Sequence, residues 1–426
     1  MLSNVSVPLL GAVDTAVVGR LPEPQHLGGV AVGAAIFSMV FWVFGFLRMG
    51  TTGPTAQALG AGDGDEVRGT LGRAALTALV LGAAVIAVQA PLAWAVFPLV
   101  GAEGAVADLG RSYYAIRVWG APATLLNYAL LGWLLGMQDA RAALVLQLAL
   151  NVTNMALDLW FVMGLGWGVQ GVAVASVLAE AGAAALGLAL VRRKLRGHPG
   201  AWHRRRVFDG ARLRRMFAIN GDIFVRTLCL QAAFFLFTAE SARMGPLVLA
   251  ANAVLLNLQH VMAYALDGFA HATEALTGHA IGARDGRRLR GALAAATAWA
   301  VPFAGAFALA YGVAGEALVG AMTTIPQVRA TALSFLPWLV AAPLLSVWSY
   351  LLDGLFLGAT RTAAMRNAMI LSLALYVLAL QGLVHLWGAQ GLWAALMLLM
   401  VLRAATLGLA LPPLLRAAAA AARPAP

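Results

Sequence analysis

Thr55-Ala-Gln-Ala-Leu-Gly-Ala-Gly-Asp63 and Thr277-Gly-His-Ala-Ile-Gly-Ala-Arg-Asp285 are two versions of one nine-residue segment, 222 positions apart and identical at five positions. The pattern Tyr128-x3-Gly132-x3-Gly136 returns at the same separation as Tyr350-x3-Gly354-x3-Gly358. Repetition at a fixed separation indicates a fold built from two copies of one unit. In membrane transporters built this way, substrate usually binds at the interface between the copies.

Composition places this repeat in a membrane. The chain has 426 residues, of which 61% are hydrophobic and 11% charged, and its mean hydropathy is +0.82. Apolar runs of about 20 residues recur, each long enough to cross about 30 Å of hydrocarbon. Lipid offers no water to backbone groups, and continuous apolar character without period-2 alternation selects helices over barrel strands. We therefore predict an all-α polytopic membrane protein with twelve transmembrane helices, at residues 2–20, 30–57, 69–96, 112–135, 142–163, 168–191, 213–238, 247–281, 291–313, 331–357, 366–386 and 391–412.

The basic residues predict the orientation of these helices. Twenty-one of the 29 lie in the termini and alternate loops on one side, ten of them between Arg192 and Arg215, and only four lie in the opposite loops. This bias predicts that both termini and the central joint face the cytoplasm. Six helices precede the joint and six follow it, so both copies have the same orientation. We therefore predict a six-helix lobe at 1–191, a basic linker at 192–212 and a second six-helix lobe at 213–426, related by a parallel repeat.

Several classes of function are excluded or disfavoured. The net charge of +11 is concentrated in the joint, which we interpret as a topology signal and a contact for anionic lipid headgroups, and we expect no nucleic acid partner. The sole cysteine, Cys229, excludes a disulfide framework. Neither a phosphate-loop glycine-lysine pair nor a histidine followed by glutamate occurs, so we expect no enzyme, no cofactor and no ATP-driven pump. Net transport would then use an ion gradient.

Polar residues on four predicted helices of the first lobe lie at a similar depth. Asp14 and Asp158 are each about 9 Å from the outer helix end at 1.5 Å per residue. Asn154 lies on the same face as Asp158, while Ser176 and Asn127 lie at a comparable depth on their own helices. A carboxylate removed from water binds a proton more readily, and a second one nearby strengthens this. The cluster is therefore a candidate H⁺ site, or a Na⁺ site at Asp14, Asn154, Asp158 and Ser176. The alternative is a hydrogen-bonded network that only holds helices together.

The second lobe and the second helix carry other charged groups inside apolar segments. Asp222 and Arg226 are four residues apart on one helix face, and we predict that they form a structural ion pair. The remaining groups either line a cavity that faces the cytoplasm or extend to the inner surface. They are Asp267, Glu274, Asp353 and Arg48.

Several motifs along the chain resemble those of the multidrug and toxic compound extrusion (MATE) family, and within it most closely the DNA-damage-inducible protein F branch. The motifs are Pro8-Leu-Leu-Gly-Ala-Val-Asp14-Thr-Ala-Val-Val-Gly-Arg-Leu21, Phe46-Leu-Arg-Met-Gly-Thr-Thr-Gly53 with Thr55-Ala-Gln57, Asn220-Gly-Asp222-Ile-Phe-Val-Arg226, Leu266-Asp-Gly-Phe-Ala-His-Ala-Thr-Glu274 and Tyr350-Leu-Leu-Asp-Gly-Leu-Phe-Leu-Gly-Ala-Thr360.

The resemblance implies twelve helices in two lobes that form a V, and export of diverse, often cationic, amphipathic compounds in exchange for H⁺ or Na⁺. It also implies that Asp14, Asn154, Asp158, Ser176 and Asn127 match the family's ion-coupling positions. Protonation of the first-helix aspartate is linked in the family to bending of that helix, and Pro8 is placed to permit this. Only 13 residues precede the aspartate, so we expect the first helix to lack one or two turns and to couple less well.

We therefore predict an antiporter that acts by alternating access in a bacterial inner membrane, with small amphipathic substrates and the bilayer as partners, and functioning as a monomer. H⁺ is favoured over Na⁺ because the resembled branch is often regarded as proton-coupled. One alternative is a flippase for lipid-linked precursors in the same superfamily, which needs a large cationic cavity. Another is a membrane scaffold that transports nothing.

Overall fold

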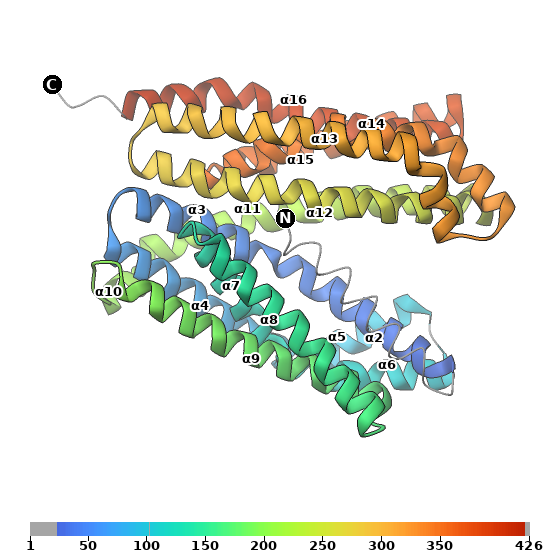
Figure 1. The fold of residues 1–426 in the computed structure, drawn as a ribbon, viewed down its shortest axis with the longest axis horizontal. Helices are drawn as coiled ribbons and strands as arrows, with labels where there is room; N and C mark the ends of the chain where they lie inside the picture. Colours follow the sequence, from blue (N-terminus) through green and yellow to red (C-terminus); the bar gives the residue numbers. More distant parts are fainter. Residues whose placement is uncertain (1–23, 102, 422–426) are drawn as a thin grey trace. The chain divides into compact units, whose positions relative to one another are not determined.

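The computed structural model describes residues 24–101 and 103–421, and these residues form helices and turns without any strand. Figure 1 shows the helices coloured along the chain. Eleven helical spans in this part are long and apolar enough to cross a membrane, from Gly28–Gly60 to Ala389–Arg416. The prediction of an all-α polytopic protein is therefore confirmed. The first predicted helix, at 2–20 and including Asp14, lies outside the described residues.

The chain divides into two compact units, residues 2–217 and 218–426. The helices of the first unit are α2 (Pro24–Trp42), η1 (Val43–Gly45), α3 (Phe46–Gly60), α4 (Gly64–Ala87), α5 (Gln89–Val100), α6 (Gly104–Arg117), η2 (Val118–Gly120), α7 (Ala121–Gly136), α8 (Ala140–Asp158), η3 (Leu159–Gly164), α9 (Gly168–Arg196) and α10 (Arg204–Val207). Helix α11 (Gly210–Arg243) crosses the boundary. The second unit continues with α12 (Pro246–Gly282), α13 (Gly286–Met322), α14 (Pro326–Gly358), α15 (Thr362–Trp387) and α16 (Ala389–Ala421).

Some predicted segments are single helices, and others are interrupted. The segment predicted at 69–96 is divided between α4 and α5 at Val88. Pro91 lies in the first turn of α5, where its missing N–H needs no helical acceptor, so a new helix begins there at low cost. The segments at 30–57 and 112–135 each contain one 3₁₀ turn, η1 and η2.

The repeated sequence folds into the same turn twice. Gly62 and Arg284 both have positive φ, +69° and +54°, and the following Asp63 and Asp285 accept main-chain N–H groups at the starts of α4 and α13. A carboxylate at this position satisfies donors that the first helical turn leaves open. The second repeated turn also has positive φ at equivalent positions, +56° at Gln138 and +53° at Thr360.

The repeated glycines bring two helices into backbone contact in each unit. A Cβ at Gly132 of α7 would lie 2.3 Å from the Arg48 carbonyl oxygen of α3. A Cβ at Gly354 of α14 would lie 2.2 Å from the Ala270 carbonyl oxygen of α12. Small residues at such crossings let helices pack closely in a membrane, where apolar burial alone does not drive association.

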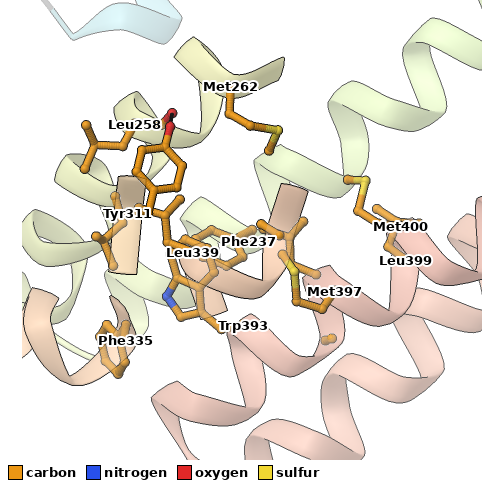
Figure 2. Packing of buried hydrophobic residues seen from close by; sticks show 14 of the residues in the cluster. Phe237, Leu258, Met262, Tyr311, Phe335, Leu339, Trp393, Met397, Leu399 and Met400 are labelled. Carbon is orange, nitrogen blue, oxygen red and sulfur yellow. Dashed lines mark hydrogen bonds between the residues drawn. The ribbon is translucent and has the colours of Figure 1, made fainter. Parts of the chain in front are cut away.

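A large apolar cluster fills the second unit (Figure 2). The Trp393 indole packs edge-on against Phe237, with ring centroids 5.3 Å apart, and donates a 2.8 Å hydrogen bond to Asn252. The Asn252 amide in turn donates to the Ser241 hydroxyl at 2.8 Å. This buried tryptophan therefore satisfies its polar atom while it links α11, α12 and α16.

The basic segment after α9 folds back onto the first unit. Arg206 in α10 makes hydrogen bonds of 2.7 and 2.8 Å to the two carboxylate oxygens of Asp63 at the start of α4. Arg212 forms an ion pair with Glu66 in the first turn of the same helix. These contacts attach the linker to the end of α4 that carries its acidic residues.

Candidate functional site

The predicted polar cluster of the first unit begins on α8. Asp158 is 0% exposed, and the Asn154 side-chain nitrogen donates to its Oδ2 at 3.1 Å. The same nitrogen lies 3.4 Å from the hydroxyl oxygen of Ser176 on α9. Three of the predicted residues, Asn154, Asp158 and Ser176, therefore come together between two helices. Sequence spacing of four residues was enough to predict the contact within α8.

The helix changes its winding directly after this aspartate. Residues Leu159–Gly164 form a π-helix. Such segments are rare and are often found at functional sites, because they reorient side chains within an otherwise regular helix. Asp158 is therefore the last α-helical residue before a local irregularity.

A second buried group lies one turn further along α9. Glu180 accepts hydrogen bonds of 2.8 and 2.5 Å from the two terminal nitrogens of Arg117 at the end of α6. It also accepts from the Thr124 hydroxyl on α7. The Arg117 guanidinium lies 3.9 Å from the centroid of the Phe37 ring on α2. This bidentate pair joins four helices.

Asn127 belongs to this second group. Its side-chain nitrogen donates to the main-chain oxygen of Glu180 at 2.9 Å. Ser176 and Glu180 lie one turn apart on α9, so the two polar groups are neighbours along this helix, one extending to α8 and the other to α7 and α6. Sequence reasoning singled out Asn127 but did not find the Arg117–Glu180 pair. The signal was present, because two opposite charges inside apolar segments predict a partner for each.

The predicted ion pair between Asp222 and Arg226 is wrong. Asp222 accepts hydrogen bonds from Arg366 at 2.6 Å and from the Thr362 hydroxyl at 2.8 Å. Both partners lie at the start of α15. Spacing of four residues placed the two groups on one face, but each met a better-oriented partner on a neighbouring helix.

Arg226 instead pairs with Asp353 on α14, which also accepts a 2.7 Å hydrogen bond from Arg403 on α16. The carboxylate of Asp353 therefore lies between two guanidinium groups inside the second unit. Asp353 and Arg403 are both buried, so Asp353 does not extend to the surface as one interpretation held.

The remaining predicted residues are distributed along α12 and α3. Glu274 is fully buried beside the close approach of Gly358, while Asp267, nearly two turns earlier in α12, is half-buried. Arg48 on α3 is half-buried next to Gly132. Asp14 lies outside the described residues. Among residues 24–101 and 103–421, no group of three His, Cys, Asp or Glu side chains is arranged to hold a metal ion.

The described residues are helical, with eleven spans long and apolar enough to cross a membrane, and the chain divides into two units that repeat one sequence pattern and bury ionisable groups. This is the architecture of a polytopic membrane transporter. Comparison with known proteins identifies the family. The MatE family model matches residues 1–160 and 223–381. The chain is 44% identical over 96% of its length to the DNA damage-inducible protein F of Escherichia coli (strain K12), covering 88% of that protein. The chain therefore belongs to the MATE family of multidrug efflux transporters.

More distant relatives agree with this assignment. The chain is 31% identical over 66% of its length to a probable multidrug resistance protein NorM of Deinococcus radiodurans, covering 62% of that protein. Among solved structures, MATE in the bent conformation superimposes with a TM-score of 0.87 at 21% identity, covering 99% of this chain and 94% of the other. An outward-facing MATE transporter gives a TM-score of 0.88, also at 21% identity, covering 98% and 94%. The structural comparisons support the fold.

Proposed function

We propose that this MATE transporter exports amphipathic, often cationic, compounds in exchange for H⁺, and that Asp158 is a residue that binds and releases the proton. The observation that carries the proposal is the complete burial of Asp158 inside a membrane-spanning helix, with Asn154 donating to one carboxylate oxygen at 3.1 Å. Ionised carboxylates are costly in such surroundings, so their presence there favours a function that uses the charge.

The arrangement suggests how protonation acts on the first unit. Binding a proton neutralises Asp158 and converts one of its oxygens from an acceptor into a donor. The hydrogen bond from Asn154 then weakens, because it is no longer assisted by the negative charge. The adjoining π-helix at Leu159–Gly164 provides a segment whose winding can change. A coupling ion shifts the transporter only if the two conformations bind it with different affinity, and this group supplies a means for that difference.

The orientation of Asn154 favours H⁺ over Na⁺. Its amide nitrogen faces both Asp158 and the Ser176 hydroxyl. A Na⁺ ion in the same place needs oxygen ligands, so the amide would have to turn over before it could coordinate the ion. A proton needs no such change. The matching aspartate at position 14 remains a predicted second member of the site.

The flippase alternative receives less support. A pyrophosphate site needs cationic groups that are available to the ligand. Within the described residues, Arg117 is engaged with Glu180, and Arg226 and Arg403 with Asp353. The buried Arg68 donates to main-chain oxygens. Arg48 has a buried nitrogen without a hydrogen-bond partner, but a single arginine does not form a large cationic cavity.

The test is transport in proteoliposomes, with efflux of a fluorescent lipophilic cation driven by an imposed pH gradient or an imposed Na⁺ gradient. We expect Asp14→Asn and Asp158→Asn to reduce pH-driven efflux at least tenfold. The matched control is Asp108→Asn, which removes a carboxylate whose side chain is 76% exposed in the same unit. Efflux that survives both the Asp14 and the Asp158 substitution would show that these residues do not couple transport, and efflux driven only by Na⁺ would identify the other ion.

A further inference from the structure

The first unit contains a groove that is separate from the proposed ion-coupling residues, because none of them is among its lining residues. It has a volume of about 630 Å³ and runs between α4 and α9, where the segment after α9 returns across them. This volume lies within the range of roughly 300–1,000 Å³ typical of small-molecule sites. The groove lies at the basic end of the unit, which the distribution of arginines predicts to face the cytoplasm.

The groove has an apolar floor and a basic rim. Leu71 and Ala75 of α4 face Leu188 and Val191 of α9 along the floor. At the rim lie the side chains of Arg192 and Arg196 in the last turns of α9, and that of Trp202. Trp202 is 56% exposed, as is common for tryptophans at the boundary between hydrocarbon and headgroups. The lining includes no acidic residue.

Neither rim arginine is paired with a carboxylate in the part of the chain that the structure describes. The acidic residues at this end are engaged elsewhere. Asp63 and Glu66 bind Arg206 and Arg212, and Asp139 binds Lys194 at 2.9 Å. Arg192 and Arg196 are therefore exposed positive charges beside the apolar floor of the groove. A ligand that matches both features carries a negative charge attached to an apolar chain.

Arg68 fixes the closed end of the groove. Its buried guanidinium donates to the main-chain oxygens of Leu195 and His198 at 3.0 and 2.9 Å, and to that of Pro199 at 2.9 Å. These carbonyls lie at and beyond the end of α9, where helical acceptors are left without donors. Gly200, with φ of +120°, then lets the chain pass against Gly64, where a Cβ would lie 2.5 Å from a main-chain carbon. The end of the groove is therefore held in place by specific hydrogen bonds and close main-chain packing.

The geometry points to a binding site for one anionic phospholipid, with its phosphate at Arg192 and Arg196 and an acyl chain along Leu71, Ala75 and Leu188. Basic residues next to membrane-spanning helices attract anionic headgroups, and Leu188 is exposed on the floor, where a chain can lie against it. A cationic transport substrate is disfavoured here by the same charges.

The test is native mass spectrometry of the detergent-solubilised protein titrated with phosphatidylglycerol, or with phosphatidylcholine of the same acyl chains. We expect wild type to bind one phosphatidylglycerol in preference. Arg192→Gln with Arg196→Gln is expected to weaken this binding about 25-fold, because each surface arginine contributes a factor of about five. The matched control, Arg204→Gln with Arg205→Gln, removes the same charge from the same linker outside the groove and is expected to change binding less than twofold.

A second variant tests the apolar part independently. Ala75→Phe keeps every charge but fills the floor, and it is expected to reduce phosphatidylglycerol binding at least tenfold while circular dichroism and the melting midpoint remain near wild type. Equal binding by wild type and both groove variants overturns the proposal. Displacement of the lipid by an equal concentration of inorganic phosphate also overturns it, because the site would then recognise a free anion. The assay measures binding alone, so its outcome is independent of ion coupling.

Discussion

In the unit of residues 2–217, α3 and α7 cross at Gly132, and in the unit of residues 218–426, α12 and α14 cross at Gly354, each glycine lying against a main-chain carbonyl. The buried charges do not follow this repetition. At the 222-residue separation, Arg117 corresponds to Leu339. Further along, Trp167-Gly168-x-Gln-Gly171 aligns with Trp387-Gly388-x-Gln-Gly391 at a separation of 220, so that Glu180 corresponds to Met400. Leu339 and Met400 belong to the apolar cluster of the second unit (Figure 2). The two copies have kept their helix crossings and changed what lies between the helices.

The difference extends to α8 and its counterpart α15. Asp139 and Arg361 precede these helices 222 positions apart, but Trp167 and Trp387 beyond them are 220 apart. The first copy therefore holds two additional residues, and it winds Leu159–Gly164 as a π-helix, whereas α15 continues as an α-helix to Trp387. Counted from the shared start of these helices, Asp158 corresponds to the buried Leu380. The irregular winding and the buried acid at this position therefore occur together in one copy only.

The largest expected effect comes from breaking the Arg117–Glu180 pair. Glu180→Met alone leaves a buried guanidinium without its carboxylate, and we expect a loss of about 3–5 kcal/mol in the free energy of unfolding. Arg117→Leu alone is expected to cost a similar amount. The double variant, which installs the residues of the second copy, is expected to recover most of the loss because both desolvated charges are removed. Thermal unfolding in detergent measures all three. A double variant no more stable than the single ones would contradict an equivalence between the two sites.

The next largest effect is expected at the helix crossings that the two copies share. Gly132→Ala and Gly354→Ala place a methyl group 2.3 and 2.2 Å from a carbonyl oxygen, so the helices must separate. We expect each to lower the free energy of unfolding by about 1–3 kcal/mol, as overpacking does. Gly382→Ala in α15 is the control, since no atom lies within 4 Å of its Cβ position. It is expected to be neutral or stabilising by up to about 1 kcal/mol. Strongly unequal losses at the two crossings would show that the same packing contributes different amounts to the stability of the two units.

These comparisons also show what a sequence can reveal. The apolar runs and the repeated glycines predicted the class of fold, because helix length and close packing depend on local sequence. The contact between Asn154 and Asp158 was predicted for the same reason, since residues four apart share a helix face. The break at Val88 was missed because the hydropathy of the segment continues across it.

Partners from different helices were not predictable in the same way. Arg117 and Glu180 are 63 positions apart, and nothing in local spacing joins them. Asp222 was assigned to Arg226 because that was the nearest opposite charge on its own helix, whereas Arg366 lies 144 positions away. Ion pairs in a bundle depend on the rotation of each helix about its axis, and that rotation is set by packing over the whole unit.

A third experiment addresses the π-helix. Deleting Met163 and Gly164 restores the spacing of the second copy, and we expect Leu159 and the residues after it to wind as a regular α-helix. The deletion would thus remove the π-helix next to Asp158, on which the proposed coupling depends. We expect gradient-driven efflux to fall about tenfold, or 1.4 kcal/mol in activation free energy. Deletion of two residues from the loop Thr323–Ile325 is the control. Unchanged efflux in a variant whose helix is regular would show that coupling does not depend on the π-helix.

The smallest effect concerns the residue that precedes α8. The Asp139 carboxylate accepts two hydrogen bonds, from the Lys194 ammonium at 2.9 Å and from the Ala142 N–H at 3.0 Å. At the equivalent position before α15, Arg361 makes no side-chain capping hydrogen bond. The hydrogen bond from Lys194, followed by that from Ala142, lowers the pKa of Asp139 despite partial burial. A carboxylate whose pKa is lower in the folded state contributes stability above its unfolded pKa of about 3.9, and loses it as the pH falls through the folded value.

Asp139→Asn keeps a capping side chain but removes the ion pair. We expect it to lower the free energy of unfolding by about 0.2–1 kcal/mol at pH 7, the range for partly exposed pairs. The difference from wild type is expected to shrink below about pH 4 and to vanish once Asp139 is protonated. Melting midpoints between pH 2.5 and pH 7 measure it, and Lys194→Gln should show the same loss at neutral pH. A difference that persists at the acidic limit would mean that the aspartate acts through its shape as a cap and not through its charge, and the two copies would then differ less at this turn than their sequences imply.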